Sequence, residues 1–166
     1  MNREIITSEY FVQPGYICLP HSATLLYTVT GSGIAVTLYD TKQKKGGMSH
    51  FTRAKRVHKH ISTPMYAYPS ISGLINMLLN SGSKLEDLEA HIFGGAENPE
   101  AHNYIVNLAN ENIEAAFKIL SKKNICIAGM NIGSRRGRKV MFNTFSGETI
   151  VSSVNSIRES DWYPRV

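Results

Sequence analysis

The sequence predicts an α+β domain with a β-sheet or β-sandwich core flanked by helices. Two observations favour this class. Segments with the two-residue period of strands recur along the chain, and two segments with helical periodicity lie between them. The length of 166 residues is that of one domain, so we expect residues 1–166 to form a single domain.

The first clear strand is predicted over residues 33–40, where alternate apolar residues share one face: Ile34, Val36 and Leu38. Residues 40–47 are polar, end in Gly46-Gly47 and predict a turn. Residues 48–51 are expected to return antiparallel to the first strand.

The middle of the chain predicts a loop, a helix and another strand. Residues 53–69 are basic, contain Pro64 and Pro69, and are typical of a surface loop. A helix is predicted where apolar residues recur at helical spacing, and Gly82 is expected to end it: Ile71, Leu74, Ile75, Leu78 and Leu79. Residues 88–93 predict a strand that ends in Gly94-Gly95-Ala96.

The longest helix is predicted from one stripe of residues: Leu108, Ala109, Asn112, Ile113, Ala116, Phe117 and Leu120. Asn107 or Asn110 is expected to cap its start. Residues 125–128 predict a short core strand, and residues 139–144 and 148–154 predict a hairpin around Ser146-Gly147.

The composition indicates a globular chain, because 42% of the residues are hydrophobic and 19% are charged. Cys18 and Cys126 cannot build a disulfide framework, and there is no CxxC pair that would suggest a zinc site. The first ten residues lack the apolar segment of a signal peptide, and no run of 18 apolar residues occurs. We therefore expect a cytoplasmic protein that does not span a membrane and needs no cofactor and no metal.

The charge is mildly basic, at +5 from 18 Lys+Arg and 13 Asp+Glu, and the basic residues are clustered. One cluster, the basic loop, comprises Arg53, Lys55, Arg56, His58, Lys59 and His60, and a second comprises Arg135, Arg136, Arg138 and Lys139. No aromatic residue lies within the basic loop and no nucleic-acid-binding motif accompanies it, so we expect no nucleic-acid partner. A metal site at His50, His58 and His60 is disfavoured by the surrounding positive charge.

Four segments in register resemble the chemoreceptor glutamine deamidases of the CheD family, over nearly the whole chain. The family has a Leu-Gly-Ser-Cys-Val-Ala-Val strand, then Gly-Gly-Met-x-His, a central Gly-Gly-Ala element and a late Gly-Gly-x-x-Gly-Arg-Lys-Val loop. The corresponding segments here are residues 29–40, Gly46-Gly47-Met48-Ser49-His50-Phe51, Ala90-His91-Ile92-Phe93-Gly94-Gly95-Ala96 and Gly133-Ser134-Arg135-Arg136-Gly137-Arg138-Lys139-Val140.

The resemblance implies a CheD-like cysteine hydrolase fold and an enzyme that converts receptor glutamines to glutamates and hydrolyses glutamate methyl esters. Its chemistry needs a thiolate, a histidine that accepts the thiol proton, and a group that orients the histidine. His50 matches the histidine. Thr28 matches the orienting threonine, although a one-residue shift in the strand would place Tyr27 there and reverse the face. We expect His50 and Thr28 to approach each other across adjacent strands, beside the backbone of Gly33.

The nucleophile of the family is not present at its position, because the Gly-Ser-Cys of the pattern is Gly31-Ser32-Gly33 here. Ser32 is adjacent, but on a strand its hydroxyl would point to the opposite face from His50. Neither Cys18 nor Cys126 is expected to replace the missing thiol. Further departures occur at residues 51–54, residues 107–111, Asn131 and Ser134.

Two hypotheses follow from the resemblance. The first is an active deamidase of methyl-accepting chemotaxis receptors. The alternative is a catalytically inactive CheD-like protein that binds receptors or a CheC-type chemotaxis phosphatase. In either case, we expect Arg53, Lys55, Arg56 and Lys59 to be exposed and to attract an acidic helical partner.

Overall fold

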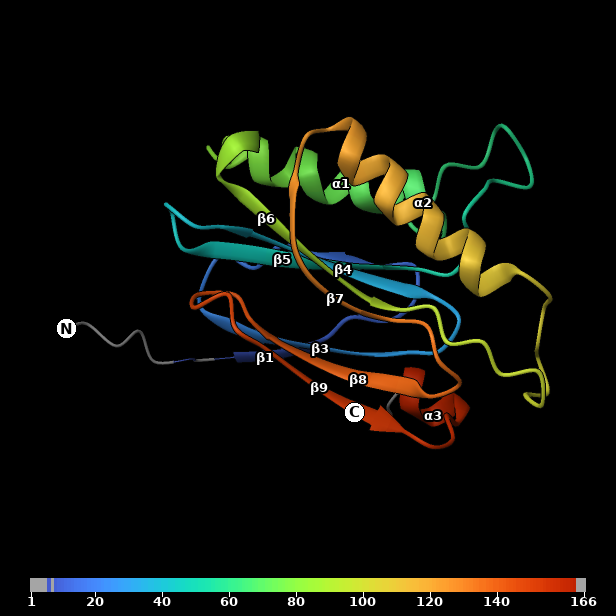
Figure 1. The fold of residues 1–166 in the computed structure, drawn as a ribbon. Helices are drawn as coiled ribbons and strands as arrows, with labels where there is room; N and C mark the ends of the chain where they lie inside the picture. The colour runs from blue at the N-terminus through green and yellow to red at the C-terminus, as the bar shows by residue number, and fades with distance from the viewer. Residues whose placement is uncertain (1–5, 7, 164–166) are drawn as a thin grey trace.

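The protein has three layers: two helices, a five-stranded sheet and a four-stranded sheet (Figure 1). The architecture is taken from a computed structural model that describes residue 6 and residues 8–163. The predicted α+β class, with a sandwich core and helices outside, is confirmed. Within the described part of the chain, no helix is long and apolar enough to cross a membrane.

The two sheets are built from separated parts of the sequence. The four-stranded sheet has the order β1 (Ser8–Phe11), β3 (Thr24–Thr30), β8 (Gly137–Asn143) and β9 (Thr149–Val154). The five-stranded sheet has the order β2 (Ile17–Cys18), β5 (Lys45–Phe51), β4 (Ile34–Asp40), β6 (Leu88–Gly94) and β7 (Cys126–Ile132). Neighbouring strands are antiparallel except β1 with β3 and β6 with β7, which are parallel.

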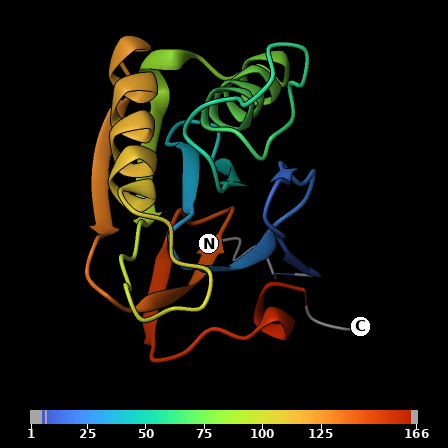
Figure 2. The same ribbon diagram turned by 90° about the vertical axis from the view of Figure 1, so that its right-hand side faces the viewer.

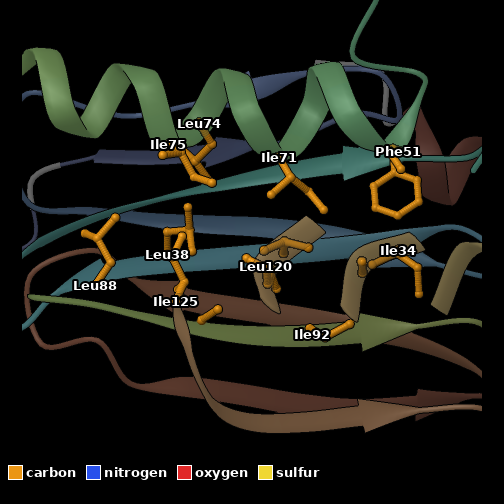
Figure 3. Packing of buried hydrophobic residues seen from close by; sticks show 14 of the residues in the cluster. Ile34, Leu38, Phe51, Ile71, Leu74, Ile75, Leu88, Ile92, Leu120 and Ile125 are labelled. Atoms are coloured by element: carbon orange, nitrogen blue, oxygen red, sulfur yellow. The ribbon is translucent and has the colours of Figure 1, made fainter. Parts of the chain in front are cut away.

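Both helices, α1 (Ala67–Asn80) and α2 (Leu108–Lys122), cover one face of the five-stranded sheet (Figure 2). Ile34, Val36 and Leu38 of β4 pack against them, as the two-residue period predicts. Figure 3 shows this core, in which α1 contributes Ile71, Leu74 and Ile75. The other face of β4 presents Ala35 to the four-stranded sheet, so this strand is buried on both sides.

Residues 31–33 carry the chain from one sheet to the other, because β3 belongs to the four-stranded sheet and β4 to the five-stranded sheet. Residues before this crossover and residues on the hairpin after it therefore face each other across the space between the sheets. Residues 133–136 make the return crossover from β7 to β8.

The β4–β5 hairpin is tighter than the sequence predicts. Strand β5 begins at Lys45, so Gly46 and Gly47 lie in the strand and the turn covers only residues 41–44. Buried Asp40 holds this turn, because its Oδ1 accepts hydrogen bonds of 2.9 Å from the backbone N–H groups of Lys42 and Gln43. This local bonding replaces the longer loop that the polar residues suggest.

One predicted element boundary is wrong, and one predicted helix cap stands at the expected position without its capping hydrogen bond. Helix α1 begins at Ala67, so Pro69 lies in its first turn, where the missing N–H has no partner to lose. Asn107 precedes α2 in the left-handed region, with φ of 62°, and its side chain makes no capping hydrogen bond. The stop of α1 near Gly82, with φ of 100°, and the hairpin of β8 and β9 agree with the predictions.

Three other features differ from expectation. Strand β7 is an edge strand and not a core strand, and Cys126 on it is exposed. Strands β1 and β2 are too short to show a period. The short helices η1 (Leu85–Asp87) and α3 (Glu159–Trp162) also lack an apolar stripe, and α3 begins with a capping interaction between Arg158 and Asp161.

We predict that Asp40→Ala lowers the free energy of unfolding by about 1–3 kcal/mol, because the exposed turn loses the two hydrogen bonds that the buried Asp40 carboxylate accepts from its backbone. Asp40→Asn keeps a side-chain oxygen and should cost less. Urea denaturation followed by circular dichroism measures both. Glu86→Ala, at an exposed acidic residue, is the control. An equal loss of unfolding free energy in Glu86→Ala would contradict the stabilising role of the Asp40 hydrogen bonds.

Candidate active site

His50 and Thr28 meet in the space between the two sheets. The Nδ1 atom of His50 lies 2.9 Å from the Oγ1 atom of Thr28, and both side chains are 1% exposed. Thr28 is on β3 and His50 on β5, so they face each other from different sheets and not across adjacent strands as expected. Tyr27 is only partly buried and belongs to the opposite face of β3, so the geometry selects Thr28.

The hydrogen bonds of Thr28 fix the tautomer of His50. The Thr28 hydroxyl donates its one proton to the backbone carbonyl of Val12, at 2.8 Å. Towards His50 it can therefore only accept, and Nδ1 must carry the imidazole proton. The Nε2 atom is then left with its lone pair free to accept a proton.

Burial keeps this imidazole neutral. Loss of hydration disfavours the charged form and lowers the pKa of His50 from 6.5 to about 4. At neutral pH the side chain is a neutral base oriented by one threonine, which is the state that a general base needs before it accepts a proton.

Position 33 lies directly beside the free Nε2 atom. A Cβ built on Gly33 would stand 3.1 Å from Nε2 of His50 and 2.9 Å from the backbone oxygen of Phe51. Gly33 is not among the residues with positive φ, so its backbone conformation accepts an L side chain. A short side chain here would point at the imidazole after the Phe51 carbonyl shifted slightly.

The backbone carbonyls of the crossover that contains Gly33 accept three hydrogen bonds from other segments. The carbonyls of Gly31 and Gly33 accept from the N–H groups of Ala96 and Gly95, at 2.8 and 3.0 Å. The carbonyl of Ser32, between them, accepts from the side chain of Asn112 at 3.0 Å. Gly94 approaches the Gly33 carbonyl too closely for a side chain, and its φ of 117° also requires glycine.

A cavity of about 480 Å³ opens beside Gly33 and His50. It lies at the end of the sandwich where residues 52–66, residues 95–107 and α3 gather (Figure 1). Gly33 and His50 form part of its wall together with Ser32, which lies in the bend at residues 31–33 and not on a strand. Neither Cys18 nor Cys126 lines the cavity, and burial raises the pKa of the Cys18 thiol. No thiol of the chain therefore lines the cavity beside position 33.

The basic residues divide into exposed and buried groups. Arg53, Lys55, Arg56 and Lys59 are all exposed, as expected, and Arg53 lines the cavity. Arg135 and Arg136 are exposed as well. Arg138 differs from the rest of its cluster, because it is 4% exposed and donates to the Gly133 carbonyl and to the Asn131 side chain. Its role is to brace the return crossover.

Sequence reasoning missed several residues of the site. Val12 accepts from Thr28 through its backbone, which no side-chain pattern reveals. Ile157 and Trp162 line the cavity from a segment without periodicity. Asn112 carried the one available signal, because it is a polar residue within the apolar stripe of α2.

The family described as "CheD chemotactic sensory transduction" matches residues 51–153. The chain is 31% identical over 143 residues to a probable chemoreceptor glutamine deamidase CheD of Trichlorobacter lovleyi, which covers 86% of this chain and 89% of the relative. A protein of the same name from Sulfurimonas denitrificans is 34% identical over 133 residues, covering 79% and 85%. One from Methanococcus maripaludis is 27% identical over 148 residues, covering 89% and 96%.

We predict that His50 makes stability pH-dependent in acid. The unfolded imidazole, with a pKa near 6.5, binds a proton more readily than the folded one, with a pKa of about 4. This contribution is fully present above pH 6.5 and is lost as pH falls towards 4, about 2–3 kcal/mol between pH 7 and pH 4.5.

Urea denaturation at both pH values measures the effect, with His50→Gln as the comparison because glutamine does not titrate. The wild type should lose more free energy of unfolding than His50→Gln does. Equal losses in the two proteins would show that His50 titrates as it does in the unfolded chain.

Proposed function

The chain belongs to the CheD family, and from this premise we propose that it works in chemotaxis on chemoreceptors, at a glutamine deamidation site built on His50 and Thr28. The reaction is the hydrolysis of a glutamine side-chain amide to glutamate and ammonia, and the same site would hydrolyse glutamate methyl esters. The single observation that carries the proposal is the neutral His50, whose free Nε2 faces position 33 and the cavity.

In deamidation of this type each residue would have a defined role. A thiol at position 33 gives its proton to Nε2 of His50, and the thiolate attacks the amide carbon. The imidazolium returns the proton to the leaving nitrogen as ammonia departs, and water then hydrolyses the thioester to the carboxylate. Thr28 accepts from Nδ1–H throughout and keeps the ring in place.

Gly33 supports a second candidate function, in which the chain binds receptor helices or a CheC-type phosphatase without catalysis. Glycine has no group that could attack the amide carbon, and neither cysteine lines the cavity. The two candidates share the fold and the cavity, and the chemical step is present only in the first. Both place the protein in the cytoplasm, where the receptor helices carry the target glutamines.

The basic loop supports an acidic helical partner in either case. Its four Arg and Lys side chains are exposed, and Arg53 reaches the cavity wall. Positive charge beside the site would accelerate encounter with a negatively charged helix and orient it.

Because Gly33 offers no nucleophile, the non-catalytic candidate predicts that the wild type deamidates receptor helices little or not at all, and we predict that Gly33→Cys raises the activity. The substitution restores a nucleophile next to a base that is already neutral and oriented. Mass spectrometry of a receptor cytoplasmic fragment after incubation measures conversion of glutamine to glutamate, and circular dichroism first establishes that the variant folds.

Gly33→Ser and the double variant Gly33→Cys with His50→Gln are the controls, since the first lacks a thiol and the second lacks the base. Substantial activity of the wild type would overturn the non-catalytic candidate. A folded but inactive Gly33→Cys variant would instead mean that the departures at residues 51–54 and 107–111 have dismantled the site.

We predict that replacing Arg53, Lys55, Arg56 and Lys59 together by Gln weakens association with a receptor fragment about threefold to tenfold at low salt, and much less at high salt. Fluorescence anisotropy of a labelled receptor fragment measures the affinity at each ionic strength.

The matched control replaces Lys84, Lys118, Lys122 and Lys123 by Gln, because these exposed lysines lie outside the cavity and the change in net charge is the same. If both sets weaken binding equally, the effect reflects net charge alone. If binding changes neither with salt nor with either set of substitutions, the basic loop is only a solvated loop and does not contribute to receptor binding.

A further inference from the structure

Asn112 is the only fully buried amide side chain in α2. Its Nδ2 group donates two hydrogen bonds of 3.0 Å, one to the carbonyl of Ser32 and the other to the carbonyl of Thr52. Ser32 is the neighbour of Gly33, and Thr52 lies two residues beyond His50. One side chain therefore joins the two backbone segments that carry the candidate site.

These two carbonyls lie just beyond the end of a strand pair. The β4–β5 register ends with Ile34 opposite Phe51, so Ser32 and Thr52 lie outside the hydrogen-bonded ladder. The amides of Gly95 and Ala96 hold the Gly31 and Gly33 carbonyls, and Asn112 holds the Ser32 carbonyl between them. Without Asn112, Ser32 and Thr52 would lose the side chain that joins them beyond the last paired residues of β4 and β5.

Packing does not explain an amide at this position. Asn112 sits in the apolar stripe of α2, and its Oδ1 atom has no hydrogen-bond partner within the described part of the chain. Burying an unpaired amide oxygen costs free energy that an apolar side chain would avoid. The two donated hydrogen bonds are what this residue supplies.

We propose that Asn112 is a positioning residue that fixes the backbone of position 33 against Nε2 of His50. This inference rests on the proposed function, because it assigns Asn112 to the same site. Asn112 acts through the Ser32 and Thr52 carbonyls and touches neither the imidazole nor a substrate. It also ties the site to α2, whose residues Leu108 and Ala109 line the cavity one turn earlier.

The test measures the reactivity of a thiol at position 33, which requires no receptor. In the Gly33→Cys protein, iodoacetamide modification of each cysteine is followed by mass spectrometry of its peptide as a function of pH. Exposed Cys126 serves as the internal standard. We expect Asn112→Leu, which suits the apolar stripe, to slow modification of the introduced thiol about tenfold or more, because a displaced thiol no longer gives its proton to His50.

Asn112→Asp, which keeps the size of the side chain and loses the N–H donors, should give the same loss if Asn112→Leu does not fold. His50→Gln should also slow the introduced thiol, and its pH profile should match that of the Asn112 variants. Leu120→Ala is the control for a merely structural effect, because Leu120 is buried in the same helix away from the cavity.

Slowing by the Asn112 variants and by His50→Gln, with Cys126 and Leu120→Ala unchanged, supports the proposal. Equal slowing by Leu120→Ala, or no effect of Asn112→Leu, overturns it. A thiol that reacts independently of His50 overturns it too, since there is then no pairing to position. Because no receptor is present, failure here is distinguishable from absence of receptor deamidation.

Discussion

The crossover from β3 to β4 is the constraint on which the candidate site depends. Three residues, Gly31 to Gly33, carry the chain between sheets whose faces lie about 10 Å apart. Thr28 precedes the crossover on one sheet, and His50 lies on the strand that pairs with the segment after it. The crossover therefore decides that these two side chains meet and that position 33 stands beside them.

The energetics of this arrangement favour a neutral base. Thr28 gives its proton to the Val12 carbonyl and accepts from His50, so the Thr28 hydroxyl and His50 Nδ1 both have partners while Nε2 stays free. Among the residues that the structure describes, no carboxylate forms a hydrogen bond or ion pair with His50, and its pKa is lowered by burial. The structure thus provides an oriented proton acceptor whether or not a nucleophile is present, and loss of the thiol leaves the surrounding hydrogen bonds in place.

Sequence periodicity predicted the elements whose residues pack against a single core. The face of β4 that carries Ile34, Val36 and Leu38, the stripes of α1 and α2, and the β8–β9 hairpin all follow from it. It could not predict which sheet each strand joins, because β3 and β4 have the same period and yet separate at Gly31. The resemblance to the family predicted that His50, Thr28 and Gly33 lie together. It did not predict that His50 and Thr28 come from different sheets, because that depends on the topology. Asn112 was visible as a polar residue in an apolar stripe, and its two backbone acceptors were not.

The position of Trp162 has a practical consequence. It is the one tryptophan of the chain, and it lies on the cavity wall that also contains Gly33 and His50. Any molecule that enters the cavity changes the polarity around this indole, and with it the wavelength and intensity of the ultraviolet emission. The protein therefore carries an intrinsic optical reporter for occupancy of its own site, free of background from other indoles and available in the unmodified chain.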